Sequence, residues 1–292
     1  MKDNMFDKII KQANVIIKKS AIIAQEQTKN AYDKYQKFQN RERKFIPEYV
    51  INKINNDIFL KYQKNYLKGE MLRGKCLLLE TKIGGFPYLP NNMKIPKDHN
   101  DNEMRLLVQI NCEDLLYLTN FPHKGLIQIY INKNVENGIK EVKTIYHNDI
   151  DYNVKIEDIY KKTLINELDN FPIRSECNLY FTKDTDTISI NDKRYYNDFI
   201  KILNIENNYK SFTHKEIRKL NNNLNEKKST KIGGNPNFNN INGDSYNEIL
   251  LFQLVSDGKF VRINNDAIYT FYINEKDLLN RNFSNVKLIV SL

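Results

Sequence analysis

The spacing of apolar residues along the chain predicts two helices at the start and short strands after them. Residues 5–39 contain neither Pro nor Gly, and their apolar groups recur at the three- and four-residue spacing of one helical face. A second helix is predicted from Pro47 to about Leu67, since proline is favoured in the first helical turn. From Lys75 onward, short apolar runs bounded by turn residues predict strands instead.

The predicted strands share a short run of apolar or β-branched residues and cover 75–80, 105–111, 125–132, 178–182, 187–190, 248–255, 259–263, 268–273 and 286–290. Asn137-Gly138 and Asp257-Gly258 are dipeptides typical of tight hairpin turns. Helices are predicted over 155–168, 193–204 and 213–224, and the last begins with the Thr213-x-x-Glu216 spacing of a capping box. This mixture of strand runs and helices places the chain in the α+β class.

One motif occurs twice in the sequence. Residues 81–88 read TKIGGFPY, and residues 230–237 read TKIGGNPN. Each copy is followed by a similar apolar strand that carries a glutamine, LLVQI at 106–110 and LLFQL at 250–254. Self-similarity of this kind predicts a pseudo-symmetric duplication of one sheet-plus-helix unit, in which neither copy buries its sheet face alone.

The predicted organisation is a helical N-terminal extension over residues 1–70 and an α+β domain over 71–292, made of repeats at about 71–170 and 171–292. The extension holds fifteen Lys or Arg against eight Asp or Glu, in a chain with a net charge of +9. Nucleic acid or an anionic membrane is therefore considered as a partner only through residues 1–45. The interpretation that we favour is a solvated face of a helix packed against the rest of the protein.

Three cysteines, Cys76, Cys112 and Cys177, lie far apart and form no CxxC motif, which is typical of reduced thiols in the cytoplasm. Cys112 precedes Glu113 and Asp114, whose charges are expected to raise the thiol pKa and make it a poor nucleophile. No apolar run approaches the roughly 18 residues that a membrane span needs. We predict a cytoplasmic protein with no metal site and no cofactor.

Six stretches, which include both copies of the motif, follow one another along the chain: TKIGGFPYLP (81–90), MRLLVQINCEDL (104–115), FPHKGLIQIYI (121–131), KIGGNPNF (231–238), ILLFQLVSD (249–257) and FYINEKDLLNRNFSNV (271–286). In them the chain resembles the YwqG-like family of bacterial proteins of unknown function, which implies an α+β duplication over about residues 70–290. Two places depart from the family. Residues 262–267 lack the usual Trp and Gly-Asp-x-Gly turn and keep only Asp266, and Asn235 or Asn237 stands where an aromatic residue is usual. The resemblance carries over no catalytic residue.

Gln109 and Gln253 lie among apolar neighbours, and a buried amide must have partners for its donors and its acceptor. Either each amide bonds the backbone of its Gly-Gly turn, which is the interpretation we favour, or both face a shared cleft and hold a ligand. The glycines themselves fit unusual backbone angles better than a phosphate loop, because Pro rather than a helix start follows each pair.

These observations predict a non-enzymatic binding or interaction module for an unidentified protein or small molecule, with a groove between the two repeats. The candidate binding residues come from the turns and strands of the motifs and are Gly84, Gly85, Pro87, Tyr88, Gln109, Gly233, Gly234, Gln253 and Asp266. One alternative is an enzyme of unassigned reaction, for example hydrolytic, built around Asp266 and the second-repeat loops with Asp244 and Asp257. The other is anionic-surface binding through the basic N-terminal helix.

Overall fold

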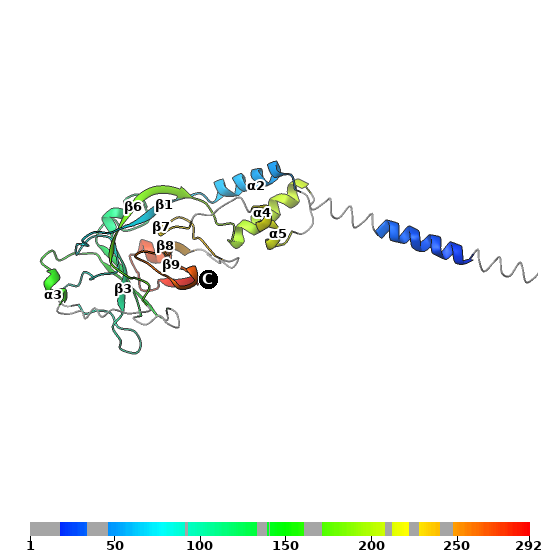
Figure 1. Cartoon of the computed structure of the whole chain (residues 1–292). Coiled ribbons are helices and arrows are strands. Elements are labelled where there is room, and N and C mark those ends of the chain that lie inside the picture. Colours follow the sequence, from blue (N-terminus) through cyan, green and yellow to red (C-terminus); the bar gives the residue numbers. More distant parts are fainter. Residues whose placement is uncertain are drawn as a thin grey trace, which may run out of the picture.

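The computed structural model describes residues 18–33, 46–90, 93–132, 139, 141–160, 171–207, 212–221, 228–239 and 248–292. Within them, antiparallel strands form one ten-stranded sheet in the order β10-β9-β8-β7-β1-β6-β2-β3-β4-β5 (Figure 1). The strands are β1 (Lys64–Leu72), β2 (Lys82–Ile83), β3 (Arg105–Asn111), β4 (Leu126–Ile131), β5 (Val142–His147), β6 (Cys177–Asp186), β7 (Lys231–Gly233), β8 (Glu248–Leu254), β9 (Ile268–Asn274) and β10 (Lys287–Ser291). The helices are α2 (Glu48–Lys61), α3 (Ile156–Tyr160), α4 (Lys193–Asn207), α5 (His214–Leu220) and α6 (Glu275–Leu279), with 3-10 turns η1 (Cys112–Leu115) and η2 (Asn264–Asp266). The fold mixes helices with an antiparallel sheet, as predicted.

A single apolar core joins the two flanks of the sheet. It contains buried side chains of β3 and β4 together with those of β8 and β9, among them Leu107, Ile127, Phe252 and Phe271. The rings of Phe252 and Phe271 stack with their centroids 6.2 Å apart. β4 is buried along its whole length and β9 along all but its last residue, which explains why their sequences read as continuous apolar runs. These four strands lie close to their predicted bounds.

The strand order has the same form on both sides of β1 and β6. Strands β7 to β10 follow one another outward from β1, and strands β2 to β5 follow one another outward from β6. The innermost strand of each flank is short and carries the motif lysine, Lys82 in β2 and Lys231 in β7. The sheet therefore holds the two copies of the motif directly against its two central strands.

A second apolar core holds α2, α4 and α5 together, and Figure 1 shows these helices gathered at one end of the sheet. Ile54 and Ile58 of α2 are buried in it with Tyr195 and Phe199 of α4. The predicted helix over 193–204 is confirmed as α4. α5 begins with the predicted capping box, in which the Thr213 hydroxyl accepts from the N–H of Glu216.

Asn55 of α2 links three helices from inside this second core. Its Nδ2 donates to Oδ1 of Asn221 at 2.7 Å, and its Oδ1 accepts from the hydroxyl of Tyr195. Asn221, at the end of α5, also donates its own Nδ2 to the carbonyl of Ile217 at 2.9 Å. All these side chains are buried. Each bond therefore replaces a contact with water that folding removes.

The second predicted helix is too long, and a central strand takes its last part. α2 ends at Lys61, where Tyr62 leaves helical angles at φ −108° and ψ 13°. β1 follows from Lys64 and pairs with both β6 and β7. The sequence of β1 has no clear alternation of apolar and polar residues, so pairing with distant strands, rather than local preference, decides its conformation.

Three short predicted strands are absent from the described sheet. Residues 75–80 are irregular, and the carbonyls of Leu77 and Leu78 instead accept from a lysine ammonium. Residues 187–190 lie beyond the end of β6. Residues 259–263 contribute only an isolated bridge between Val261 and Ile173. At that bridge the Phe260 carbonyl accepts from the N–H of Arg174, and the N–H of Arg262 donates to the carbonyl of Pro172, both at 2.8 Å.

The two predicted hairpin turns have different outcomes. Asn137-Gly138 lies outside the described residues, although β4 and β5 are antiparallel neighbours as expected. At Asp257-Gly258 a turn forms, with Gly258 at φ +73° and the Asp257 carboxylate accepting from the N–H groups of Lys259, Phe260 and Val261. Of the helix predicted over 155–168, the described residues include α3, Ile156–Tyr160.

Residues 18–33 form a helix that does not pack against the rest of the protein. Every residue in it is exposed, including Ile22 at 56% and Ile23 at 53%. Figure 1 shows this helix, drawn in dark blue, standing away from the sheet. The favoured interpretation of a helix packed on its own protein is therefore wrong for this segment. No helix in the described part of the chain has the length and apolar character to cross a bilayer.

We expect Asn55→Ala to lower the free energy of unfolding by about 2–4 kcal/mol, because it leaves Tyr195 and Asn221 buried without their shared partner. Asn56→Ala, at the exposed neighbouring position, is the matched control and should change it by less than about 0.5 kcal/mol. Urea unfolding followed by circular dichroism measures both. Equal effects of the two substitutions would contradict the structural role of Asn55.

Candidate functional site

Both Gly-Gly turns have a backbone conformation that favours glycine. Positive φ angles between +65° and +73° occur at all four glycines of the motifs, Gly84, Gly85, Gly233 and Gly234. A Cβ on Gly85 would lie 2.2 Å from a carboxylate oxygen of Glu176, and one on Gly234 would lie 2.6 Å from Oδ2 of Asp186. In each turn the missing side chain lets a carboxylate approach the backbone.

Gln109 fixes the first turn from inside the sheet. Its Oε1 accepts from the N–H of Tyr88 at 2.9 Å, and its Nε2 donates to the carbonyls of Leu78 and Glu80 at 2.7 and 3.1 Å. The amide is fully buried. Both of its N–H groups are therefore used by backbone carbonyls that precede the first motif, and its oxygen is used by an N–H just after the Gly-Gly pair.

The first network continues into β4 and β5. Gln128 donates to the Tyr88 carbonyl and to Oε1 of Gln109, both at 2.9 Å. Its own Oε1 accepts from the hydroxyl of Tyr130 and contacts Nε2 of His147 at 2.8 Å. Burial lowers the pKa of His147 to about 4, so the ring is neutral at pH 7. This chain of side chains is satisfied by the protein itself.

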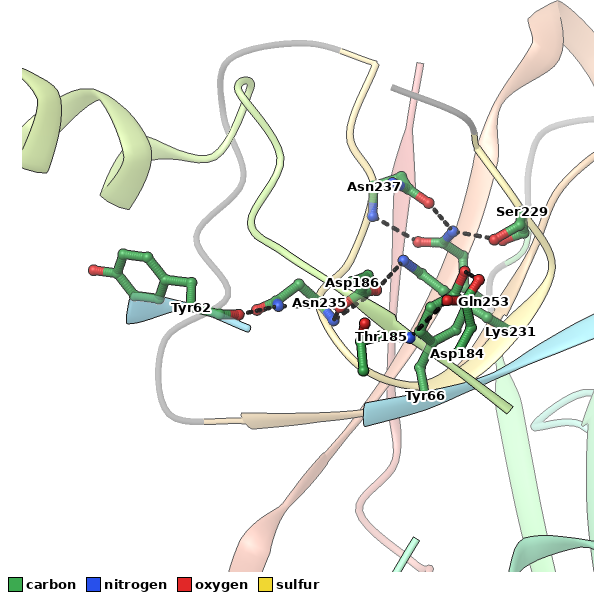
Figure 2. A network of polar contacts seen from close by, with 10 residues as sticks. All are labelled: Tyr62, Tyr66, Asp184, Thr185, Asp186, Ser229, Lys231, Asn235, Asn237 and Gln253. Carbon is green, nitrogen blue, oxygen red and sulfur yellow. Dashed lines mark hydrogen bonds and ion pairs between the residues drawn. The ribbon is translucent and has the colours of Figure 1, made fainter. Parts of the chain in front are cut away.

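Gln253 holds the second turn in the corresponding way (Figure 2). Its Oε1 accepts from the N–H of Asn237, and its Nε2 donates to the Ser229 carbonyl and to Oδ1 of Asn237, all at 2.8 Å. The next strand differs, however. Thr270 stands opposite Gln253 as Gln128 stands opposite Gln109. Within the described residues, Thr270 Oγ1 and Tyr272 OH are buried without a hydrogen-bond partner.

The motif lysine of the first flank is enclosed by backbone. Lys82 is 1% exposed, and its Nζ donates to the carbonyls of Leu77 and Leu78 at 2.9 and 3.4 Å. Burial lowers its pKa to about 8, while the nearby carboxyl groups act in the opposite direction. Segment 75–80, which was predicted as a strand, therefore acts as a cover for this ammonium.

The motif lysine of the second flank has an acidic partner instead. Lys231 Nζ lies 2.7 Å from Oδ2 of Asp186, at the end of β6, and 5.1 Å from the centre of the Tyr66 ring. The Tyr66 hydroxyl donates to Oδ2 of Asp184 at 3.1 Å. Figure 2 shows Lys231, Asp186 and Tyr66 side by side. The ion pair is mostly shielded from solvent by its surroundings.

Asp186 joins the second turn to the end of α2. Its carboxylate accepts from the backbone N–H of Asn235 at 3.0 Å and from Nδ2 of the same residue at 3.2 Å. Asn235 Nδ2 also donates to the Tyr62 carbonyl at 2.7 Å. Burial raises the pKa of Asp186, whereas Lys231 and the Asn235 N–H groups favour its ionised form.

Beside this ion pair lies a pocket of about 640 Å³, which we call the Lys231 pocket. Its wall contains apolar side chains of α2 and of the segment after β6 together with polar groups of β1, β6 and the second motif. The lining residues are Asn56, Phe59, Leu60, Gln63, Tyr66, Thr185, Asp186, Thr187, Ile188, Ile190, Ser229, Lys231 and Asn237. A site of this composition fits a ligand with one polar end and an apolar body.

None of the nine candidate residues from the sequence lines the Lys231 pocket. Pro87 and Tyr88 are buried in the first flank, where Tyr88 OH accepts from the N–H of Asp151. Asp266 is exposed in η2, and its carbonyl accepts from Asn239 Nδ2. The motif itself did contain a usable signal, since Lys231 is part of the repeated Thr-Lys-Ile-Gly-Gly.

The other candidate chemistry is also dispersed. All three cysteines are buried and free, and burial, rather than the acidic neighbours, is the main cause that raises the pKa of Cys112 to about 12. Asp257 is used by its turn, and Asp244 lies outside the described residues. Among the described residues, no three His, Cys, Asp or Glu side chains are grouped to hold a metal ion.

Comparison with known proteins identifies a family for this chain but no activity. The family described as a domain of unknown function (DUF1963) matches residues 81–291, and the chain belongs to it. No curated protein matches the sequence. The matched span includes both motifs and Lys231, whereas α2 and β1, which supply Phe59, Leu60 and Tyr66 to the pocket, precede it.

We expect Lys82→Met to change the pH dependence of stability. The pKa of Lys82 is about 8 in the folded protein and 10.5 in the unfolded chain. Between these two pH values the unfolded chain therefore binds more protons than the folded protein. The wild type should therefore gain stability relative to the variant as the pH rises from 8 to 10, by at most about 1.4 kcal/mol per pH unit.

Urea unfolding at several pH values measures this difference, and taking it relative to the wild type cancels the titration of tyrosines and cysteines. Lys68→Met, on the partly exposed face of β1, is the matched control and should give a difference that does not vary with pH. A flat difference for Lys82→Met would contradict the enclosed state of this ammonium.

Proposed function

We propose that the chain is a non-enzymatic binding module that holds a small molecule in the Lys231 pocket. The observation that carries this proposal is the contrast between the two motif lysines. Lys82 is covered by backbone carbonyls, whereas Lys231 borders a pocket of about 640 Å³. Volumes in this range are typical of sites for small organic ligands.

We infer this pocket as the site, in place of a groove lined by the turn glycines. Gln109 and Gln253 both donate their N–H groups to the protein, so neither amide has a donor left for a ligand. The polar side chains around Lys231 are engaged mainly with one another, as in the Asp186 ion pair. A site with fixed, mutually paired groups favours recognition over proton transfer.

We also propose that the two flanks of the sheet are copies of one unit. The pairing of Lys82 with Gln109 has its counterpart in the pairing of Lys231 with Gln253. β3 then shifts register against β4, and β8 shifts register against β9. In both strands the shift falls two residues before the glutamine. Matching irregularities at matching positions support common descent, because a bulge is a specific feature of a ladder rather than a general one.

The threonine that opens each motif supports the same proposal. Thr81 Oγ1 accepts from the N–H of Asn111 at 2.8 Å, and Thr230 Oγ1 accepts from the N–H of Val255 at 3.2 Å. Each accepting hydroxyl therefore binds the chain two residues beyond the glutamine of its own flank. The equivalence extends over the strand, the turn and the residue that precedes it.

Two finer proposals concern kinship and compartment. We propose that the chain is a YwqG-like protein, because it resembles that family in the motifs of residues 81–131 and 231–286. We propose the cytoplasm as its compartment, since the three buried cysteines are free thiols and fit a reducing environment.

Filling the pocket tests the proposed function. Thr187 lines the pocket, and we expect Thr187→Trp to remove the small molecule that co-purifies with the wild-type protein from its own cells. Mass spectrometry after denaturation detects that molecule. Thr182→Trp, at an exposed position of β6 outside the pocket, is the matched control and should retain it. The proposal would be refuted if the wild type and Thr187→Trp released the same molecules in the same amounts.

The exposed helix of residues 18–33 favours a second candidate function, binding of an anionic surface through residues 1–45. Its Ile22 and Ile23 are more than half exposed beside Lys18 and Lys19. Apolar side chains next to lysines are typical of helices that lie in a membrane interface.

We expect the full chain to sediment with vesicles that contain phosphatidylserine and not with pure phosphatidylcholine vesicles, because attraction to the surface is electrostatic. Deletion of residues 1–45 should abolish sedimentation, and salt at about 0.5 M should weaken it. The double substitution Ile22→Ser and Ile23→Ser removes apolar side chains without changing the charge, so it measures the apolar contribution to vesicle binding. Sedimentation that persists after the deletion would rule this function out.

A further inference from the structure

Lys231 has hydrogen-bonding capacity that its protein partners do not use. A lysine ammonium has three N–H donors. Among the described residues, Asp186 provides the hydrogen-bond acceptor of Lys231, and the Tyr66 ring lies below it as a cation–π partner. By contrast, Lys82 has two carbonyl acceptors in the first flank. Lys231 therefore keeps N–H groups for an acceptor that enters from the pocket.

The charges around the pocket favour a ligand group with one negative charge. Asp186 and Asp184 lie close to Lys231 and limit how much further negative charge the site accepts. Lys64, at the start of β1, interacts with both Asp186 and Arg194 and adds positive charge nearby. A carboxylate matches this nearly balanced field, whereas a phosphate carrying close to two charges would be repelled by the aspartates.

The other end of the pocket is apolar. Phe59 and Leu60 of α2 face the segment after β6, which provides Ile188 and Ile190. Leu60 is 72% exposed, so part of this apolar surface is in contact with water in the unliganded protein. Covering it with a hydrocarbon group is favourable, because apolar surface is then removed from water.

We propose that the Lys231 pocket binds an amphipathic monocarboxylate, with the carboxylate accepting from Lys231 Nζ and the hydrocarbon part between α2 and Ile188–Ile190. This inference rests on the proposed function and specifies its ligand class. Asp186 is then the protein's own counter-ion for this ammonium, and the ligand carboxylate competes with it for the positive charge. The carboxylate and Asp186 share one cation between them.

A single tryptophan reports binding, because the chain has none of its own. We would titrate the Leu60→Trp protein with octanoate, octanol and octyl phosphate and follow the tryptophan emission. We expect saturable binding of octanoate that is about tenfold or more tighter than that of octanol or octyl phosphate. Lys231→Met in the same protein should weaken octanoate about tenfold to a hundredfold and leave octanol unchanged. Lys68→Met is the matched control and should leave octanoate binding unchanged.

Asp186→Asn provides a second, opposite variant. It keeps the ammonium and removes the competing carboxylate, so octanoate should bind several-fold more tightly. Equal binding of octanoate and octanol, unaffected by Lys231→Met, would overturn the carboxylate inference and leave the pocket as a binding site. Preference for octyl phosphate would overturn it as well. Absence of saturable binding of all three probes, together with the same co-purified molecules in wild type and Thr187→Trp, would instead overturn the proposed function.

Discussion

The burial of one glutamine amide in each flank constrains the sheet, the turn and the motif together. Gln109 and Gln253 are fully buried, and each unmatched donor or acceptor there would cost about 1–3 kcal/mol. Each amide oxygen accepts from a backbone N–H just after the Gly-Gly pair, that of Tyr88 or Asn237, where the turn folds the chain back over the strand. Positive φ angles at the Gly-Gly pair allow that reversal. The repeated combination of Gly-Gly, Pro and Gln in the sequence thus describes one physical unit.

The same unit gives two different environments for the lysine beside it. In the first flank the chain runs from β1 through residues 73–80 straight to the motif, and its carbonyls surround Lys82. In the second flank the chain runs from β6 into α4 and α5 before it returns to the motif. Among the described residues Asp186, rather than a set of carbonyls, is the hydrogen-bond partner of Lys231 and balances its charge. A buried ammonium needs either acceptors or a counter-ion, and the two flanks use one of each.

The sequence predicted what local pattern decides and missed what distant pairing decides. β3, β4, β8 and β9 were predicted because continuous apolar runs accompany burial on both faces. β1 was missed because its side chains alternate poorly and its strand conformation comes from pairing with β6 and β7. The pocket was missed for the same reason. Tyr66, Asp186 and Lys231 are far apart in the sequence, and only the central pairing of β1 with β6 and β7 brings them together.

The position of the helices explains why the Lys231 pocket lies in the second flank. α2, α4 and α5 share a core of their own, tied by Asn55, and this core also contains Ile188 of the segment after β6. The space left beside Lys231 is bounded by α2 on one side and by β1 and β7 on the other. The ion pair at the edge of this space is mostly shielded from solvent and adds little stability, because desolvation offsets much of its Coulombic gain. Polar groups kept at such a position at the expense of packing are typical of a binding site, because a ligand completes the contacts that the fold leaves open.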